Sequence, residues 1–118
     1  HTAEEFTQMI ESILIKHLAA ELELPVYIEM PEHPPKSFVI LDRTGGEYEN
    51  GINTASFAIQ SYGVSIAEAA RLNERVKLAL DWDRLPRDIM SARLNSDYNF
   101  SDTQKRKYRY QAVYEIFY

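Results

Sequence analysis

The sequence contains no cysteine, only four glycines and no long apolar run. The lack of cysteine excludes a disulfide framework and thiol chemistry. No stretch approaches the roughly 18 consecutive apolar residues of a membrane-spanning helix. Positive charge is also in deficit, because 13 lysines and arginines face 18 aspartates and glutamates, leaving a net charge of -5. A general nucleic-acid-binding protein is more often basic overall.

Signatures of catalytic sites are missing as well. The sequence has no G-x-S-x-G elbow, no P-loop and no His-Glu-x-x-His motif. His17 lies beside an apolar helical stripe, which is typical of a histidine packed at the core edge, and His33 stands among prolines as a loop residue. The segment Asp81-Trp82-Asp83 offers too few ligands for a metal site. We therefore expect no enzyme, no cofactor and no metal ion.

Apolar residues recur at three- and four-residue spacing in two segments, which predicts two amphipathic helices. The first begins at a capping box of Thr2 and Glu5 and ends before Pro25. The second begins at a capping box of Ser65 and Glu68. The two apolar stripes consist of Phe6, Met9, Ile10, Ile13, Leu14, Leu18 and Leu22, and of Ala69, Leu72, Val76, Ala79 and Leu80.

Alternating and β-branched segments predict strands at residues 25–31, 37–44, 54–63, 89–100 and 107–118. The first of these should be short or at a sheet edge, because prolines flank it. The order helix, three strands, helix, two strands predicts one α+β domain over residues 1–118. We expect an antiparallel sheet of four to five strands, packed on one side against the two helices. In the turn between the second and third strands, Gly45, Gly46, Asn50 and Gly51 should take conformations open mainly to Gly and Asn.

The last predicted strand follows a cluster of basic residues and is rich in tyrosine. Because alternate residues of a strand face opposite sides, the tyrosines lie on one face and the basic residues on the other. A core-facing aromatic row is therefore favoured over a nucleic-acid stacking platform, which needs aromatic rings and cations on one accessible face. A membrane anchor would need a basic amphipathic helix, which is absent here. The row Tyr108, Tyr110, Ala112, Tyr114 and Ile116 should meet Phe6, Ile10, Leu14, Leu72, Val76 and Leu80.

The middle of the chain, "FVILDRTGGEYENGINTASFAIQSYGVSIAEAARLNERVKLAL", resembles the small tail-completion, or tail-terminator, proteins that join head and tail in long-tailed bacteriophages and prophages. A hydrophobic strand ends in Arg43-Thr44-Gly45-Gly46, and a polar turn and a second strand follow. A helix of the type S-x-A-E-A-x-x-L-x-x-x-V-x-x-A-L then begins directly. The closing "KYRYQAVYEIFY" resembles the R-Y-Q strand near the end of those proteins, so the similarity spans roughly residues 25–118.

The resemblance implies a structural protein rather than an enzyme. Such subunits form a homo-oligomeric ring, typically of six copies, at the head-proximal end of the tail. The ring ends growth of the tube and contacts the tail-tube protein and the head-completion or connector protein. DNA passes through its hole without specific binding, and an acidic lumen would repel phosphate. The implied location is the virion tail, assembled in the bacterial host cytoplasm without a membrane.

Two charged regions are the candidate subunit interfaces of such a ring. The turn around Tyr48 should project and touch a neighbouring subunit, with an idle surface loop as the alternative. The basic residues between Lys105 and Arg109 should form ion pairs with Glu47, Glu49 or Asp83 of the next copy. We also expect the last strand to outrun its partners and leave an unpaired edge. The interface hypothesis comprises Glu47, Tyr48, Glu49, Lys105, Arg106, Lys107 and Arg109.

Two other functional classes stay open. A small nucleic-acid-binding adaptor would use the C-terminal basic and aromatic strand, and its binding would depend steeply on salt. A small hydrolase or isomerase would need a deep pocket with converging titratable groups.

Overall fold

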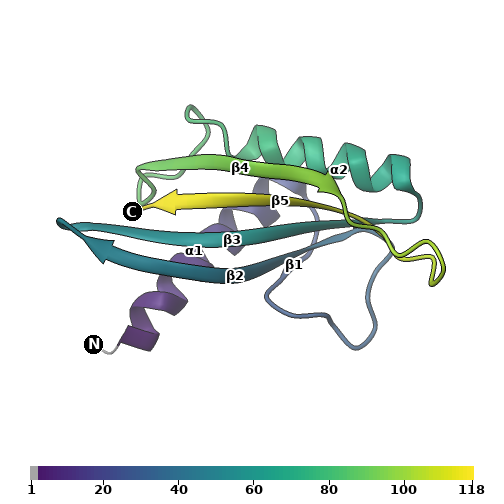
Figure 1. Ribbon diagram of the computed structural model, residues 1–118, viewed down its shortest axis with the longest axis horizontal. Coiled ribbons are helices and arrows are strands. Elements are labelled where there is room, and N and C mark those ends of the chain that lie inside the picture. Colours follow the sequence, from purple (N-terminus) through teal and green to yellow (C-terminus); the bar gives the residue numbers. More distant parts are fainter. Residues whose placement is uncertain (1–2) are drawn as a thin grey trace.

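The computed structural model describes the backbone of residues 3–118 and the side chains of residues 10–118. Thr2 and the side chains of Glu5, Phe6 and Met9 lie outside the described part, and so do the predictions made for them. The elements confirm the α+β class and the predicted order (Figure 1). They are α1 (Ala3–Leu22), β1 (Val26–Tyr27), β2 (Phe38–Glu49), β3 (Ile52–Gly63), α2 (Ile66–Ala79), β4 (Ser91–Asn99) and β5 (Tyr108–Phe117).

The five strands form one sheet in the order β1-β2-β3-β5-β4. The prediction of a purely antiparallel sheet is wrong at one edge, because β1 pairs in parallel with β2, Val26 opposite Val39 and Tyr27 opposite Ile40. A parallel pair needs a connection that carries the chain back to the starting end, and the proline-rich segment 28–37 provides it. The expected short edge strand is confirmed, and Pro25, directly before it, cannot donate to the ladder.

The position of β5 differs from the prediction. It does not outrun its partners but lies between β3 and β4 and is paired along its length on both sides. Phe117, for example, is opposite Thr54 on β3 and Ser91 on β4. Pattern in a single strand shows which residues share a face, but not whether the strand is central or at an edge. Within the described residues, the strand edge without a partner belongs to β4, and to β2 beyond its short pairing with β1.

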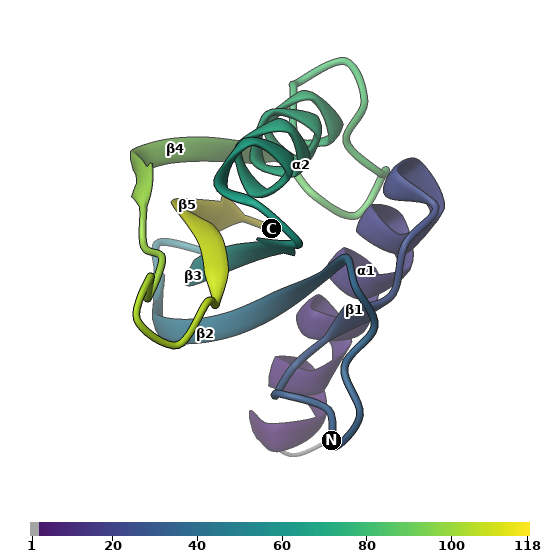
Figure 2. The same cartoon turned by 90° about the vertical axis from the view of Figure 1, so that its right-hand side faces the viewer.

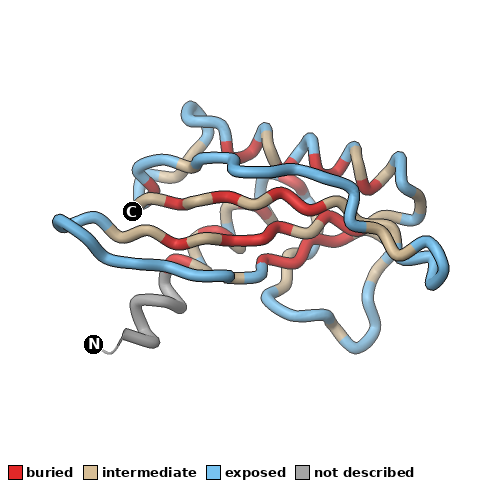
Figure 3. Tube along the Cα trace, viewed as in Figure 1, coloured by how far each residue is buried: buried red, intermediate tan, exposed pale blue. Residues whose placement is uncertain are grey.

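Both helices cover the same face of the sheet, and the opposite face carries no helix (Figure 2). Buried residues concentrate in the middle of the strands and on the inner sides of the helices (Figure 3). Tyr108 and Tyr110 are only half-buried, so the predicted row enters the core over its second half alone. The core consists of Ile10, Leu14, Leu18, Leu22, Val39, Leu41, Ala55, Phe57, Ile59, Leu72, Val76, Ala79, Leu80, Ile89, Ala112, Tyr114 and Ile116.

Polar contacts hold both ends of α2, and one of them joins it to α1. The Ser65 side chain accepts a hydrogen bond of 3.2 Å from the amide of Glu68, which confirms the predicted N-cap of α2. At the other end, His17 Nε2 donates to the carbonyl of Ala79 at 2.7 Å. His17 therefore has the structural role expected from its place beside the stripe. In the described part of the chain, no helix is long and apolar enough to cross a bilayer.

The turn between β2 and β3 is tighter than predicted. Asn50 and Gly51 have φ values of 53° and 80° and form the whole connection, as expected for an Asn-Gly hairpin. Gly45 and Gly46 do not have positive φ; they lie inside β2, just after a bulge, so the prediction for them is wrong. Gly46 is required for another reason, because a Cβ there would come within 2.9 Å of the Thr54 carbonyl and would also meet the Arg43 guanidinium.

Candidate interaction surfaces

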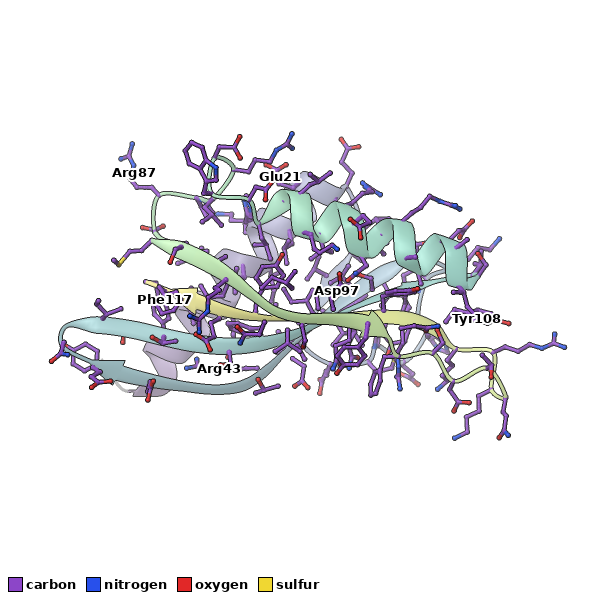
Figure 4. All side chains as sticks on the ribbon, turned by 45° about the horizontal axis from the view of Figure 1, so that its top comes forward. Glu21, Arg43, Arg87, Asp97, Tyr108 and Phe117 are labelled. Atoms are coloured by element: carbon purple, nitrogen blue, oxygen red, sulfur yellow. The ribbon has the colours of Figure 1, made fainter. Side chains whose placement is uncertain are left out.

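The two charged regions singled out in the sequence lie at opposite ends of the molecule. The β2–β3 turn and the β4–β5 turn mark the two ends of its longest axis, along which the chain extends 45 Å (Figure 1). Tyr108 and Phe117, at the two ends of β5, show the direction of this axis among the side chains (Figure 4). We call residues 47–52 the acidic tip and residues 105–107 the basic turn.

The acidic tip is an exposed two-stranded projection. All of its residues are exposed, and Tyr48 keeps 70% of its surface in solvent. The last tie to the rest of the sheet is a pair of backbone hydrogen bonds between Asn53 and Tyr118, at 2.9 and 3.1 Å. Tyr48 is opposite Asn53, whereas Glu47 and Glu49 alternate to the other face of the hairpin. The tip therefore presents a phenol ring on one face and two carboxylates on the other.

The basic turn is held in shape by its own hydrogen bonds. Asp102 and Lys107 exchange two backbone bonds of 2.8 and 2.9 Å. The Asp102 carboxylate also accepts from the amide of Lys105 at 3.2 Å, and Arg106 takes a left-handed conformation with φ 55°. The side chains of all three basic residues are exposed. The turn therefore presents three cations on a backbone of defined shape.

Arg109 lies in β5 rather than in the turn, and its guanidinium is used within the chain. Nε donates to the carbonyl of Phe100 at 2.8 Å, and Nη1 donates to the hydroxyl of Tyr62 at 2.9 Å. The guanidinium carbon lies 4.5 Å from the centre of the Phe100 ring and 5.7 Å from that of Tyr62. These are cation–π distances. The interface hypothesis at this end therefore rests on the basic turn, with Arg109 supporting it from inside.

Aromatic side chains from several strands gather around Arg109 on the face of the sheet without helices. Phe38 and Tyr62 stack with ring centres 4.5 Å apart and 7° between their planes. On the other side of Arg109, Tyr98 meets Phe100 edge to face at 5.9 Å. Sequence reasoning missed this cluster, because it considered alternation within the last strand and not the residues that neighbouring strands place on the same face. The strands of Phe38 and Tyr62 had been predicted, but not their pairing register with β5.

The exposure of this cluster limits it as a stacking platform. Phe38 and Tyr62 keep only 4% and 6% of their surface in solvent. Tyr98 and Phe100 are more open, at 41% each. A polar chain runs beside them: Tyr62 donates to Gln60, Gln60 to Gln111, and Gln111 to Tyr98. Most of the ring surface and the hydrogen-bonding groups are thus already used within the protein.

A pocket of about 350 Å³ lies between the proline-rich segment after β1 and the basic turn. We call it the proline pocket. Its lining combines the aromatic pair Phe38 and Tyr62 with several prolines and with cationic side chains, and Glu32 is its one carboxylate. The residues that line it are Met30, Pro31, Glu32, Pro34, Pro35, Lys36, Phe38, Tyr62, Gly63, Arg106, Lys107 and Tyr108.

A group of ionic contacts lies where α2 meets the edge strand β4. Lys77 Nζ lies 2.5 Å from Asp97 and 2.7 Å from Glu74. Asn73, itself buried, donates to Asp97 at 2.6 Å, and Asp97 lies below α2 (Figure 4). Burial raises the pKa of Asp97, but the hydrogen bonds from Lys77 and Asn73 outweigh it and hold this pKa below its ordinary value. The hydrogen bonds to Asp97 and Glu74 raise the pKa of Lys77.

This ionic cluster attaches β4 to the helix layer. Tyr114 packs beside it, and burial raises the pKa of its phenol to about 12. Among the described residues, no group of three or more His, Asp or Glu side chains could hold a metal ion. The role that the contacts give to Lys77, Asp97 and Asn73 is structural, because Lys77 and Asn73 on α2 both donate to Asp97 on β4.

The predicted interface residues thus fall into three groups. Those of the acidic tip and of the basic turn are exposed at opposite ends and cannot meet within one copy. Arg109 is occupied inside the chain. Asp83, the other acidic partner considered, is exposed in the segment between α2 and β4.

The chain matches no protein-family model, and a search of curated proteins finds no sequence similar to it.

Proposed function

We propose that this protein is a ring-forming structural subunit that ends the growth of a phage or prophage tail tube and joins the tail to the head. One observation carries the proposal: the acidic tip and the basic turn lie at opposite ends of the long axis. Two complementary patches on different parts of one subunit make a heterologous, head-to-tail contact. Repetition of such a contact closes into a ring when the rotation between copies allows it.

The arrangement of the elements also fits the resemblance to tail-terminator proteins. The segment that carries the resemblance folds as β2, β3 and α2 in direct succession, with Ser65 capping the helix two residues after the strand ends. The R-Y-Q segment lies at the start of β5, which is paired on both sides between β3 and the edge strand β4. These elements form one layered body from which the acidic tip projects (Figure 1).

In the proposed ring, the partners are further copies of this chain, the tail-tube protein below and the head connector above. The net charge of -5 makes the subunit repel DNA phosphate on average. That suits a passage through which DNA moves without being held. The proposed site of action is the virion tail, after assembly in the bacterial cytoplasm.

The test is whether the purified protein assembles and whether the assembly caps tubes. Negative-stain electron microscopy at low salt should show rings with a central hole, and the solution mass should be a whole multiple of the chain, six being the expected number. Addition of these rings to a polymerising tail-tube protein from the same gene cluster should give shorter, capped tubes. A protein that stays monomeric at high concentration would refute the ring, and tubes of unchanged length would refute the capping.

A nucleic-acid-binding adaptor is the second candidate, because Tyr98 and Phe100 are partly open beside the cationic Arg109. This function predicts oligonucleotide binding that weakens steeply with salt. Substitution of Phe100 by alanine should then reduce the affinity, since base stacking on an aromatic ring contributes about 1–3 kcal/mol. The ring proposal predicts no measurable oligonucleotide binding by the same protein.

A further inference from the structure

We infer that the proline pocket of each copy receives Tyr48 from the acidic tip of the next copy. This inference rests on the proposed ring and identifies the contact that would build it. The occupant is therefore a second copy of this chain, and the residues that meet are Tyr48 with its flanking glutamates on one side and the aromatic, proline-walled pocket on the other.

The tip has the properties of an inserted group. Tyr48 is a large aromatic residue that keeps 70% of its surface exposed near the end of a two-stranded projection. Nearby Ile52 is also exposed, at 39%. Neither residue belongs to the described hydrophobic clusters of the chain. Rigid aromatic side chains of this kind are the usual anchors of protein interfaces, because they bury much area while fixing few torsions.

The pocket has the properties of a receptor for one aromatic ring. Its volume of about 350 Å³ is at the small end of the range of about 300–1,000 Å³ for ligand pockets. The stacked rings of Phe38 and Tyr62 contribute apolar aromatic surface to the lining, and prolines contribute surface with little conformational freedom. Phe38 and Tyr62 keep only 4% and 6% of their surface in solvent, so an incoming phenol meets their exposed edges and packs mainly against the prolines and the half-buried Tyr108.

The charges of the two sides are complementary. Lys36, Arg106 and Lys107 line the pocket, against the single carboxylate of Glu32. On the tip, Glu47 and Glu49 lie on the face of the hairpin opposite Tyr48. A hairpin that enters the pocket with its ring toward the aromatic pair can thus turn its carboxylates toward the cationic side chains. Such charges speed the encounter and fix the register more than they add affinity.

The positions of the two sides exclude self-pairing within one copy and favour a chain of copies. The basic turn, which lines the pocket, belongs to the end of the long axis away from the tip (Figure 1). Each copy can therefore donate one tip and accept another. Repeated head to tail, this contact closes into a ring, whereas a two-fold dimer would use the same tip and pocket reciprocally and stop at two copies.

The absence of cysteine from the chain makes a direct test available. Glu49→Cys is combined with Pro34→Cys, which keeps the Tyr48 ring and places one thiol on the tip and one in the exposed lining of the pocket. Mild oxidation should link successive copies into a covalent ladder that ends at the ring. The matched control combines Glu49→Cys with Asp88→Cys, an exposed position outside the pocket, and should give no ladder beyond chance dimers.

The outcomes separate this inference from the proposed function. Rings in the microscope together with no more cross-linking than in the control would overturn the insertion of Tyr48 while leaving the ring intact. A monomeric wild-type protein without cross-linking would overturn both. A ladder in the double-cysteine variant that is absent from the control supports both.

A mixing experiment tests the same contact without cysteine. Tyr48→Ala removes the ring from the tip, and Arg106→Glu with Lys107→Glu changes the pocket. Each variant alone should stay monomeric. Their equimolar mixture retains one intact tip and one intact pocket, so it should stop at heterodimers. Complete rings from either variant alone, or from the mixture, would overturn the inference.

Discussion

The two hairpins of the sheet differ in how they present their charge. The β2–β3 hairpin turns through two residues, Asn50 and Gly51, and projects with few hydrogen bonds to the other residues that the structure describes. The β4–β5 connection is longer and is held by the Asp102–Lys107 bridge and by Arg109. The first is built as a projecting ligand and the second as a supported surface. In the contact between copies that we propose, the acidic end would insert and the basic end would receive it.

The difference has a local cause in the sequence. An Asn-Gly pair accepts positive φ without further support, so the first turn needs no side-chain contacts. The second connection contains Ser101, whose hydroxyl both accepts from the amide of Arg109 at 3.0 Å and donates to its carbonyl at 3.2 Å. Segments with few contacts open at lower free energy than well-connected ones. We therefore expect faster amide exchange at the acidic tip than at the basic turn.

The largest effect is expected from the core that connects the two ends. Leu14 is completely buried, so Leu14→Ala should lower the free energy of unfolding by about 2–5 kcal/mol. The matched control is Leu78→Ala on α2, where the leucine is 56% exposed and the change should stay within about 0.5 kcal/mol. Denaturant titration measures both. A loss below about half a kcal/mol for Leu14→Ala would show that this face of α1 is not core.

The basic end should depend on Arg109 for its stability. Arg109→Ala removes two hydrogen bonds and the stacking against Phe100, and should cost about 1–3 kcal/mol. Arg109→Lys keeps the charge but not the planar fork, so it should recover only part of the loss. Thermal melting of both variants tests this. If Arg109→Ala melts at the same temperature as the wild type, the contacts of Arg109 do not stabilise the basic end.

The link between α2 and β4 should give a pH-dependent contribution of up to about 1 kcal/mol. Since the folded-state pKa of Asp97 lies below its ordinary value of 3.8, this stability is present above the unfolded pKa and is lost as pH falls through the folded pKa. Asp97→Asn should therefore be less stable than the wild type at neutral pH, with the difference shrinking below pH 3.8. A difference that stays constant down to acid pH would contradict the contact.

The acidic tip should contribute least to the stability of the monomer. Tyr48→Ala with Glu49→Ser should leave the unfolding free energy within about 0.5 kcal/mol of the wild type, since both residues are exposed. Assembly should nevertheless weaken. Calorimetry of the monomer and solution mass together separate the two effects. Unaltered assembly would show that the tip is an idle loop.

Most of the layered fold could be predicted from the sequence. The stripe through Leu14 and the Ser65 cap defined both helices, and alternation around Phe57 defined a central strand. The parallel pairing of β1 and the central position of β5 could not be predicted, because both depend on contacts between segments distant in the sequence. The hydrophobic pattern of a strand shows which residues face the core, but not which strands lie beside it.

The candidate surfaces were predicted only in part. The exposure of the charged residues in the acidic tip and the basic turn could be predicted, because turn-forming residues place both segments at the surface. The internal role of Arg109 could not, because its partners Tyr62 and Phe100 come from other segments of the chain. The proline pocket was missed for the same reason: it forms where the segment after β1 meets the basic turn. Neither segment alone has a sequence pattern that predicts a pocket.

The central claim is that the two ends of one copy complement each other, and a charge exchange measured by solution mass tests it most directly. Lys105→Glu, Arg106→Glu and Lys107→Glu together should abolish rings at low salt, with a smaller difference from the wild type at high salt, where screening weakens the contact. Adding Glu47→Lys and Glu49→Lys to the same chain should restore the ring mass. If the triple variant assembles like the wild type but has lost an oligonucleotide affinity that the wild type shows, the basic turn binds nucleic acid and the claim is contradicted.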